Sequence, residues 1–209
     1  MTLSAEQILK AGQQRLVKIR TEASDMDTWK TRLTGYQPRG DCADDVYVWF
    51  TCILALQAVI EHNFGVGSVL ADEGGTIVAQ GHNEVFSPYF RSDRHAEMVA
   101  MDAFEDAYRA CGNLGRFRLY TSLESCPMCL IRLSTSRIGR VLHAARDIPG
   151  GMVHRMSDLP PFWIELARRK SFEQAACSPE MMDAASEIFR LNVDALQEKL
   201  MRTTCRSPI

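Results

Sequence analysis

The 209-residue sequence has no long uninterrupted hydrophobic run. Its longest apolar stretch, residues 46–60, is interrupted by Thr51 and Gln57 and is shorter than the roughly 20 residues that a transmembrane helix needs. The first 14 residues include Glu6 and Lys10 and have no apolar segment of the kind found in secretory signals. We therefore expect a cytoplasmic protein with no membrane partner.

The sequence also lacks a surplus of charge of one sign. Its 24 Lys and Arg residues against 26 Asp and Glu residues give a formal net charge of -2. Proteins that bind nucleic acid through the phosphates typically carry a basic surplus. The charge therefore argues against a nucleic-acid partner, although a local basic patch is compatible with it.

Cysteine is not scarce, but its number is odd. There are seven cysteines in a chain without a recognisable secretory signal. Reducing compartments keep thiols free, and clusters of cysteines in such proteins more often bind metals than form disulfides. We expect free thiols or metal ligands.

Hydrophobic periodicity predicts helices that alternate with strands from residue 46 onward, which is typical of a layered α/β fold. Before this region, residues 5–20 form a weak helical pattern, and a cluster of helix breakers at 36–40 marks a boundary. We expect an N-terminal helical extension at 1–45, a central core at 46–177, and a C-terminal helix and tail at 178–209. Helices are predicted at 46–63, 94–109, 127–137, 162–170 and 179–201, and strands at 66–71, 76–79, 117–121, 141–144 and 171–175.

Two short motifs stand at the starts of predicted helices. The first is His95-Ala96-Glu97, and the second is Cys126-Pro127-Met128-Cys129. A catalytic zinc site takes three protein ligands and leaves a fourth position open. His95, Cys126 and Cys129 offer one nitrogen and two thiolates, and helix N-termini stabilise the thiolate charge. The motifs predict a Zn²⁺ site with these three ligands.

Glu97 follows His95 by two residues, which is about 200° around a regular helix. The two side chains can face one centre only if His95 begins the helix. Under that condition Glu97 lies beside the metal without binding it. A carboxylate placed there can move protons between water and a substrate, so Glu97 is the candidate catalytic residue.

Together the two motifs, with the flanking segment 121–129, resemble the zinc-dependent cytidine and deoxycytidylate deaminase superfamily. The element order over 46–145, about half of the chain, is also similar to the family core. The nearest group is that of the guanine, cytosine and tRNA-adenosine deaminases. The resemblance implies a three-layer α/β/α fold with a mixed sheet of about five strands, a catalytic core at 46–177, Zn²⁺ as cofactor, and a homodimer.

The activity that this resemblance implies is hydrolytic deamination of a nucleobase or nucleoside, with release of ammonia. A guanine-like purine or cytosine is the first candidate substrate. Deamination of adenosine to inosine in tRNA is the alternative. The net charge and the absence of a Lys/Arg run at 83–94 argue against the alternative.

Several other residues are candidates for substrate binding. The resemblance implies that Asn83 holds the substrate with its amide, which donates and accepts at once, although an asparagine here also suits a turn. Ser125 departs from the proline that the family usually has before the first motif cysteine. It restores a backbone N–H and frees the φ angle, and we expect zinc binding to survive this change. The remaining candidates are aromatic. Phe86, Tyr89 and Phe90 either stack on a base or pack within their loop. Trp163 ends a segment that begins at a Gly150-Gly151 hinge, and we expect this segment to fold over the pocket.

Other classes of function stay open. Cys126 and Cys129 also match a redox pair at a helix start, but that interpretation leaves His95 and Glu97 without a role. A closed structural zinc site would need a fourth ligand, such as Cys111 or His143. A deaminase-like binding or assembly module is the third possibility, and the intact ligand set with Glu97 argues against it.

Overall fold

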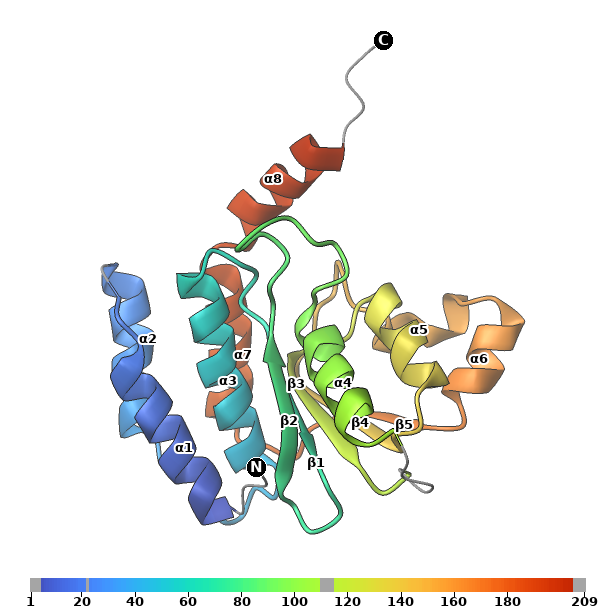
Figure 1. Cartoon of the computed structure of the whole chain (residues 1–209), viewed down its shortest axis with the longest axis horizontal. Helices are drawn as coiled ribbons and strands as arrows, with labels where there is room; N and C mark the ends of the chain where they lie inside the picture. The colour runs from blue at the N-terminus through green and yellow to red at the C-terminus, as the bar shows by residue number, and fades with distance from the viewer. Residues whose placement is uncertain (1–4, 22, 110–114, 205–209) are drawn as a thin grey trace.

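A mixed sheet with strand order β2-β1-β3-β4-β5 forms the centre of the molecule (Figure 1). The structure is a computed structural model that describes residues 5–21, 23–109 and 115–204. β1 pairs antiparallel with both β2 and β3, whereas β3, β4 and β5 are parallel. This confirms the predicted layered α/β fold with a mixed sheet. The strands are β1 (Gly67–Ala71), β2 (Ile77–His82), β3 (Arg118–Leu123), β4 (Arg140–Ala145) and β5 (Ser171–Gln174).

Helices cover both faces of the sheet, which gives the three layers (Figure 1). On one face α3 (Asp45–Ile60) and α7 (Pro179–Arg190) pack against the strands, and α1 (Ala5–Lys18) and α2 (Ser24–Gly35) pack on the outside of α3. On the other face lie α4 (Ala96–Ala107) and α5 (Pro127–Thr135), with α6 (Pro161–Ala167) against α5. The last helix, α8 (Val193–Thr204), extends beyond one end of the sheet.

Helix α3 is buried on nearly all sides because it lies between the sheet and the N-terminal helices. Its sequence is apolar all round, as expected for a central helix. A Cβ atom on Gly67 of β1 would lie 2.2 Å from the backbone oxygen of Thr51, so only glycine permits this close packing of helix on strand. On the opposite side, Trp49 donates a hydrogen bond from Nε1 to the backbone oxygen of Leu33 at 2.9 Å.

The N-terminal helices contribute to the same hydrophobic core as α3. Ile8 and Leu16 of α1 and Trp29 and Leu33 of α2 are buried in one cluster with the α3 side chains. The predicted boundary at residue 45 therefore crosses a continuous core, and the division into three parts stays a prediction.

Two adjacent aspartates connect distant segments at the start of α3. Asp44 is at the N-cap of α3, but its side chain makes no capping hydrogen bond. Instead Asp44 accepts hydrogen bonds from the Tyr120 hydroxyl and the Ala176 N–H. Buried Asp45 accepts from the Tyr36 hydroxyl and from the Arg39 and Ser178 N–H groups.

The structure differs from the predicted elements in three places. Helix α2 was not predicted, and the loop at 147–161 contains a short 3₁₀ helix, Val153–Asp158. The single closing helix predicted at 179–201 is two helices, because the chain turns at Leu191 and Asn192. In the described part of the chain, no helix is both long and apolar enough to cross a membrane.

Candidate functional site

The two motif helices begin at the same edge of the sheet (Figure 1). Cys126 is the N-cap of α5, with an extended backbone (φ -69°, ψ 171°), and Pro127 occupies the first helical position, where its missing N–H costs nothing. Cys129 follows one turn later. His95 is the N-cap of α4, also with an extended backbone (φ -71°, ψ 156°).

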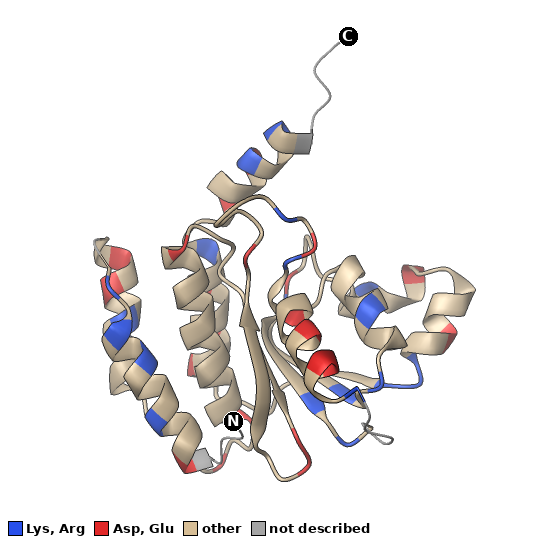
Figure 2. Cartoon of the chain, viewed as in Figure 1, with Lys and Arg blue, Asp and Glu red and all other residues tan. Residues whose placement is uncertain are grey.

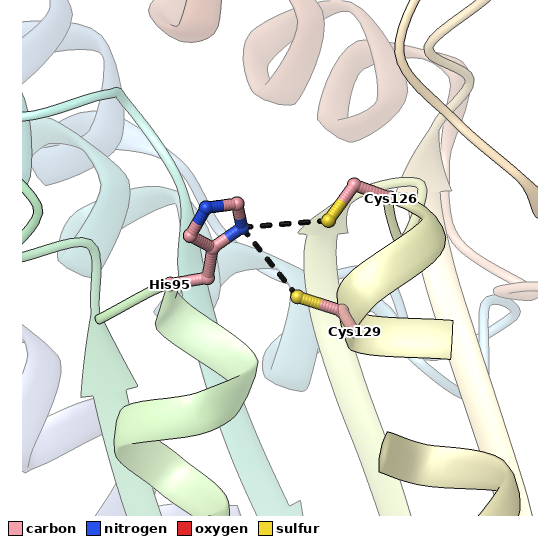
Figure 3. Close-up of side chains that lie close together, drawn as sticks. All are labelled: His95, Cys126 and Cys129. Carbon is pink, nitrogen blue, oxygen red and sulfur yellow. Dashed lines mark hydrogen bonds between the residues drawn. The ribbon is translucent and has the colours of Figure 1, made fainter. Parts of the chain in front are cut away.

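The three predicted ligands converge (Figure 3). His95 Nδ1 lies 3.5 Å from Cys126 Sγ and 3.5 Å from Cys129 Sγ, and the three atoms all lie within 4.8 Å of one another. A tetrahedral zinc ion with ordinary Zn–N and Zn–S bond lengths places nitrogen and sulfur about 3.6 Å apart. The donor set and its spacing therefore fit zinc.

The group has the composition of a catalytic rather than a closed zinc site. His143, which was considered as a fourth ligand, is not in the group of ligand atoms found among the described residues. It lies in β4, where its backbone is paired between Thr121 of β3 and Gln174 of β5. Cys111, the other candidate, lies outside the described residues. Three protein ligands leave a coordination position open for water or substrate.

Glu97 lies beside this group in the first turn of α4 and is 3% exposed. Because His95 is at the N-cap, outside the regular helix, the geometric condition for the pair is met. The Ser125 hydroxyl donates a hydrogen bond to Glu97 Oε1 at 3.0 Å. Burial, and then the nearby Cys126 thiolate, raise the pKa of Glu97 above its usual range. A buried carboxylate with a raised pKa, next to metal-binding side chains, is suited to carrying protons.

The motif thiols differ in acidity. The hydrogen bond from Cys129 lowers the pKa of Cys126 to about 4, with help from His95 and against the effect of burial. Burial raises the pKa of Cys129. Cys126 is therefore a thiolate at neutral pH, which is the form that binds metals. The five described cysteines are all free, as expected, namely Cys42, Cys52, Cys126, Cys129 and Cys177.

Asn83 follows β2 at the same edge and is 2% exposed. Its side-chain oxygen accepts a hydrogen bond from the Val85 backbone N–H at 3.1 Å. The backbone N–H of Asn83 donates to the backbone oxygen of Val66 at 3.0 Å. The first of these bonds is an asparagine turn of the kind considered above. Its role in substrate binding stays a prediction.

The four aromatic candidates for substrate binding lie in different parts of the structure. Phe86 is buried against Phe64 and Leu196, whereas Tyr89 and Phe90 are 63% and 41% exposed. Trp163 lies on α6 with its ring against Phe162. Within the described residues, no hydrogen bond or ring contact joins these aromatics to the three ligands. Their contacts with a substrate stay predictions.

Glu124, which no sequence pattern singled out, fixes the segment before the motif cysteines. It is 3% exposed and accepts hydrogen bonds from the Asp147 N–H at 3.2 Å and from both the backbone N–H and Nδ1 of His154 at 2.8 Å. A Cβ on Gly151 would lie 2.6 Å from the Glu124 carboxyl carbon, so this glycine permits close packing. The only sequence signal was the Gly150-Gly151 pair, which suggested a hinge.

Comparison with known proteins agrees with this site. Residues 44–145 match the sequence model of the family described as "Cytidine and deoxycytidylate deaminase zinc-binding region". Over these residues, just under half of the chain, the sequence is similar to the cytidine and deoxycytidylate deaminase superfamily. Among curated proteins, the chain is 34% identical over 113 residues to the tRNA-specific adenosine deaminase of Bacillus subtilis. The match covers 52% of this chain and 65% of that relative, which is less than two thirds of its length.

Solved structures share the fold at low sequence identity. A structure from a study of tRNA:A34 deaminases has a TM-score of 0.53 and 23% identity, and covers 66% of this chain and 94% of that one. Guanine deaminase from Nitrosomonas europaea has a TM-score of 0.56 and 21% identity, and covers 81% of this chain and 92% of that one. These similarities show that the chain shares the fold of these structures.

Proposed function

We propose that this protein is a zinc-dependent hydrolytic deaminase of a nucleobase or nucleoside, of the guanine-like purine or cytosine type. One observation carries the proposal. His95, Cys126 and Cys129 bring one nitrogen and two sulfurs within 4.8 Å of one another, and buried Glu97 lies beside them. A redox pair would use only the two sulfurs and would leave the imidazole and the carboxylate unexplained.

The chain's own residues then have distinct roles. His95, Cys126 and Cys129 hold the metal, and when bound the zinc ion supplies Lewis-acid activation of a water molecule. The Glu97 carboxylate takes a proton from that water and delivers it to the ring nitrogen beside the amino-bearing carbon. The oxygen of the water bonds to the amino-bearing carbon, Glu97 transfers the second proton of the water to the amino group, and the bond between that carbon and the amino nitrogen breaks. Water and the amino compound thus become the oxo compound and ammonia.

The surroundings of the site favour a small substrate. Two arginines lie in the loop before α4, but each is paired with carboxylates: Arg91 with Asp93 at 2.6 Å, and Arg94 with Glu84 at 2.6 Å and with Asp102 at 2.9 Å. In Figure 2, Lys and Arg are spread over several elements together with Asp and Glu. Paired arginines are less available to the phosphates of a nucleic acid.

Deamination of adenosine in tRNA is the second candidate. The observation that favours it is the 34% identity to a tRNA-specific adenosine deaminase over 113 residues. Since that match spans 65% of the relative, the substrate of the relative is a hypothesis for this chain.

An ammonia-release assay tests the proposal. The purified protein, with its zinc content measured, is given guanine, cytosine, their nucleosides, adenosine, and a tRNA anticodon stem-loop. We expect ammonia from at least one free base or nucleoside. Ammonia from the stem-loop alone would select the second candidate. A zinc-loaded protein that releases ammonia from none of them would be a binding or assembly module, and the proposal would be wrong.

We also propose that the protein acts as a cytoplasmic homodimer. Support comes from the superfamily resemblance and from large apolar side chains exposed on neighbouring helices, Met128 on α5 at 39% and Phe162 on α6 at 65%. Light scattering coupled to size exclusion measures the assembly. A monomer at micromolar concentration would contradict the dimer without affecting the proposed chemistry.

A further inference from the structure

Ser125 is the residue between the Glu124 anchor and the first motif cysteine. Its side chain is almost fully buried, with the residue 1% exposed, and its hydroxyl donates to Glu97 Oε1 at 3.0 Å. A buried hydroxyl needs a hydrogen-bond partner, and here the partner is the candidate catalytic carboxylate. Ser125 lies outside both motifs, and its hydrogen bond joins the residue before the N-cap of α5 to the first turn of α4.

The backbone of Ser125 is held on both sides. Its carbonyl oxygen accepts a hydrogen bond from the Met152 N–H at 2.9 Å. Immediately before it, the Glu124 carboxylate is fixed by Asp147 and His154. These contacts fix the Cα position of Ser125. The position of its hydroxyl relative to Glu97 is therefore fixed as well. A donor on a fixed backbone orients its acceptor more strongly than a donor on a mobile loop.

A glutamate side chain has three rotatable bonds, so burial alone does not fix the direction of its carboxylate. Proton transfer requires the carboxylate oxygen to lie within hydrogen-bond reach of both water and substrate. An additional donor at Oε1 selects one orientation before the substrate arrives, which lowers the entropic part of the barrier.

We propose that Ser125 is a positioning residue whose hydroxyl fixes the orientation of the Glu97 carboxylate for proton transfer. The inference rests on the proposed deaminase function. It also assigns a use to the departure of this sequence from the family pattern, because a proline at position 125 has no hydroxyl to donate. Ser125 acts through Glu97 and needs no contact with the substrate.

Steady-state kinetics of substitutions at position 125 test this role. Ser125→Ala should lower kcat roughly 10- to 100-fold and leave KM within about twofold, since a hydrogen bond to a charged group is worth this much. Ser125→Pro should behave like Ser125→Ala. Ser125→Thr keeps the hydroxyl and should recover most of the lost kcat. The matched control is Ser134→Ala. Ser134 is a buried serine of α5 whose hydroxyl donates to the Leu130 oxygen, and the variant should keep wild-type kcat.

Zinc content and thermal unfolding of each variant separate positioning from damage. Ser125→Ala should bind as much zinc as the wild type and unfold at a similar temperature. Loss of kcat under these conditions supports the inference. An unchanged kcat would overturn it, and so would a raised KM with unchanged kcat, because that pattern would place Ser125 on the substrate.

A crystallographic comparison tests the inference without turnover. In the Ser125→Ala protein the Glu97 carboxylate should occupy a rotated or a mixed orientation, whereas the wild type has one. An identical carboxylate orientation in both proteins would overturn the inference. A wild-type protein that releases no ammonia from any substrate would instead refute the proposed function, so the two failures are distinguishable.

Discussion

At the scale of single residues, the site depends on where each side chain lies relative to the start of its helix. His95 and Cys126 are both N-caps with extended backbone angles, whereas Glu97 and Cys129 lie inside the first turn. The change from extended to helical backbone lets residues two or three apart face one centre. The same arrangement places partial positive charge from two helix N-termini near the thiolates and the carboxylate.

Removal of the Glu97 carboxylate should abolish turnover and leave the metal site intact. We expect Glu97→Ala to lower kcat by roughly 10²- to 10⁴-fold, the usual contribution of a general acid or base. Zinc per chain, measured by atomic spectroscopy, should match the wild type, because Glu97 is not one of the three converging ligands. The control is Glu105→Gln on the exposed side of the same helix, which pairs with Arg132 and should keep full activity. Near-native activity in Glu97→Ala would contradict the proton-carrying role.

The group of side chains that converges could be predicted from the sequence, but the hydrogen bonds that support it could not. Spacing within each motif and the need for three ligands were enough to select His95, Cys126 and Cys129. The hydrogen bond from Ser125 to Glu97 joins residues 28 positions apart. Likewise, the bond from His154 to Glu124 joins residues 30 apart. Such pairs depend on how helices and loops pack, and a single sequence contains no local pattern for them.

At the scale of elements, strong periodicity predicted the strands and the central helices. The weak pattern at 5–20 also matches α1, but α2 was missed. The sequence of α2 buries only Trp29 and Leu33 and exposes most of the rest, so its helical pattern is faint. The break between α7 and α8 carries no proline or glycine. It is stabilised by a tertiary contact, in which Asn192 Nδ2 donates to the Asn63 oxygen at 2.8 Å. Contacts of this kind override local propensity.

Close packing of α4 on β2 should control the position of the site. A Cβ on Gly81 of β2 would lie 2.6 Å from the Ala100 nitrogen and 2.7 Å from the Ala96 oxygen, both on the α4 backbone. Gly81→Ala should therefore push α4 away from the sheet, together with His95 and Glu97. We expect a loss of about 1–3 kcal/mol in the free energy of unfolding and a lower kcat.

Denaturant unfolding and ammonia release measure the two effects of Gly81→Ala. Gly35, at the end of α2, offers the control, because a Cβ there meets nothing within 4 Å. Gly35→Ala should leave activity unchanged and stability equal or slightly higher. If Gly81→Ala retained both wild-type stability and wild-type kcat, the contact between α4 and β2 would not be the constraint described here.

At the scale of the whole molecule, Asp45 joins the start of α3 to two other segments. Its carboxylate accepts hydrogen bonds from Tyr36 and Arg39, which follow α2, and from Ser178, which precedes α7. Burial alone would raise the pKa of Asp45, but the hydrogen bonds from Arg39, Ser178 and Tyr36 outweigh it and hold the pKa below its usual range. The charged form is therefore the one that stabilises the fold.

Acidification should weaken the fold through this carboxylate. Because its pKa is lower in the folded state, Asp45 contributes its full stability above the unfolded value of about 4 and loses it as the pH falls through the folded value. Asp45→Asn should cost about 3 kcal/mol at pH 7, since an amide cannot accept from all three donors. The difference from the wild type should narrow below about pH 4. Urea unfolding at several pH values measures this difference in the free energy of unfolding, and the substitution Asp106→Asn at an exposed residue is the control. A difference that does not change with pH would contradict this role.

The N-terminal helices should unfold together with the catalytic region rather than before it. Helix α1 approaches α3 so closely that a Cβ on Gly12 would lie 2.3 Å from the Trp49 ring, and Trp49 is fully buried. Gly12→Val should therefore separate the two helices and lower the unfolding temperature of the whole chain. Circular dichroism and zinc release, recorded in the same thermal scan, should shift together, because α3 is shared by the N-terminal helices and the sheet. An early loss of helix signal, with zinc release at the wild-type temperature, would show instead that residues 1–45 form a separable unit.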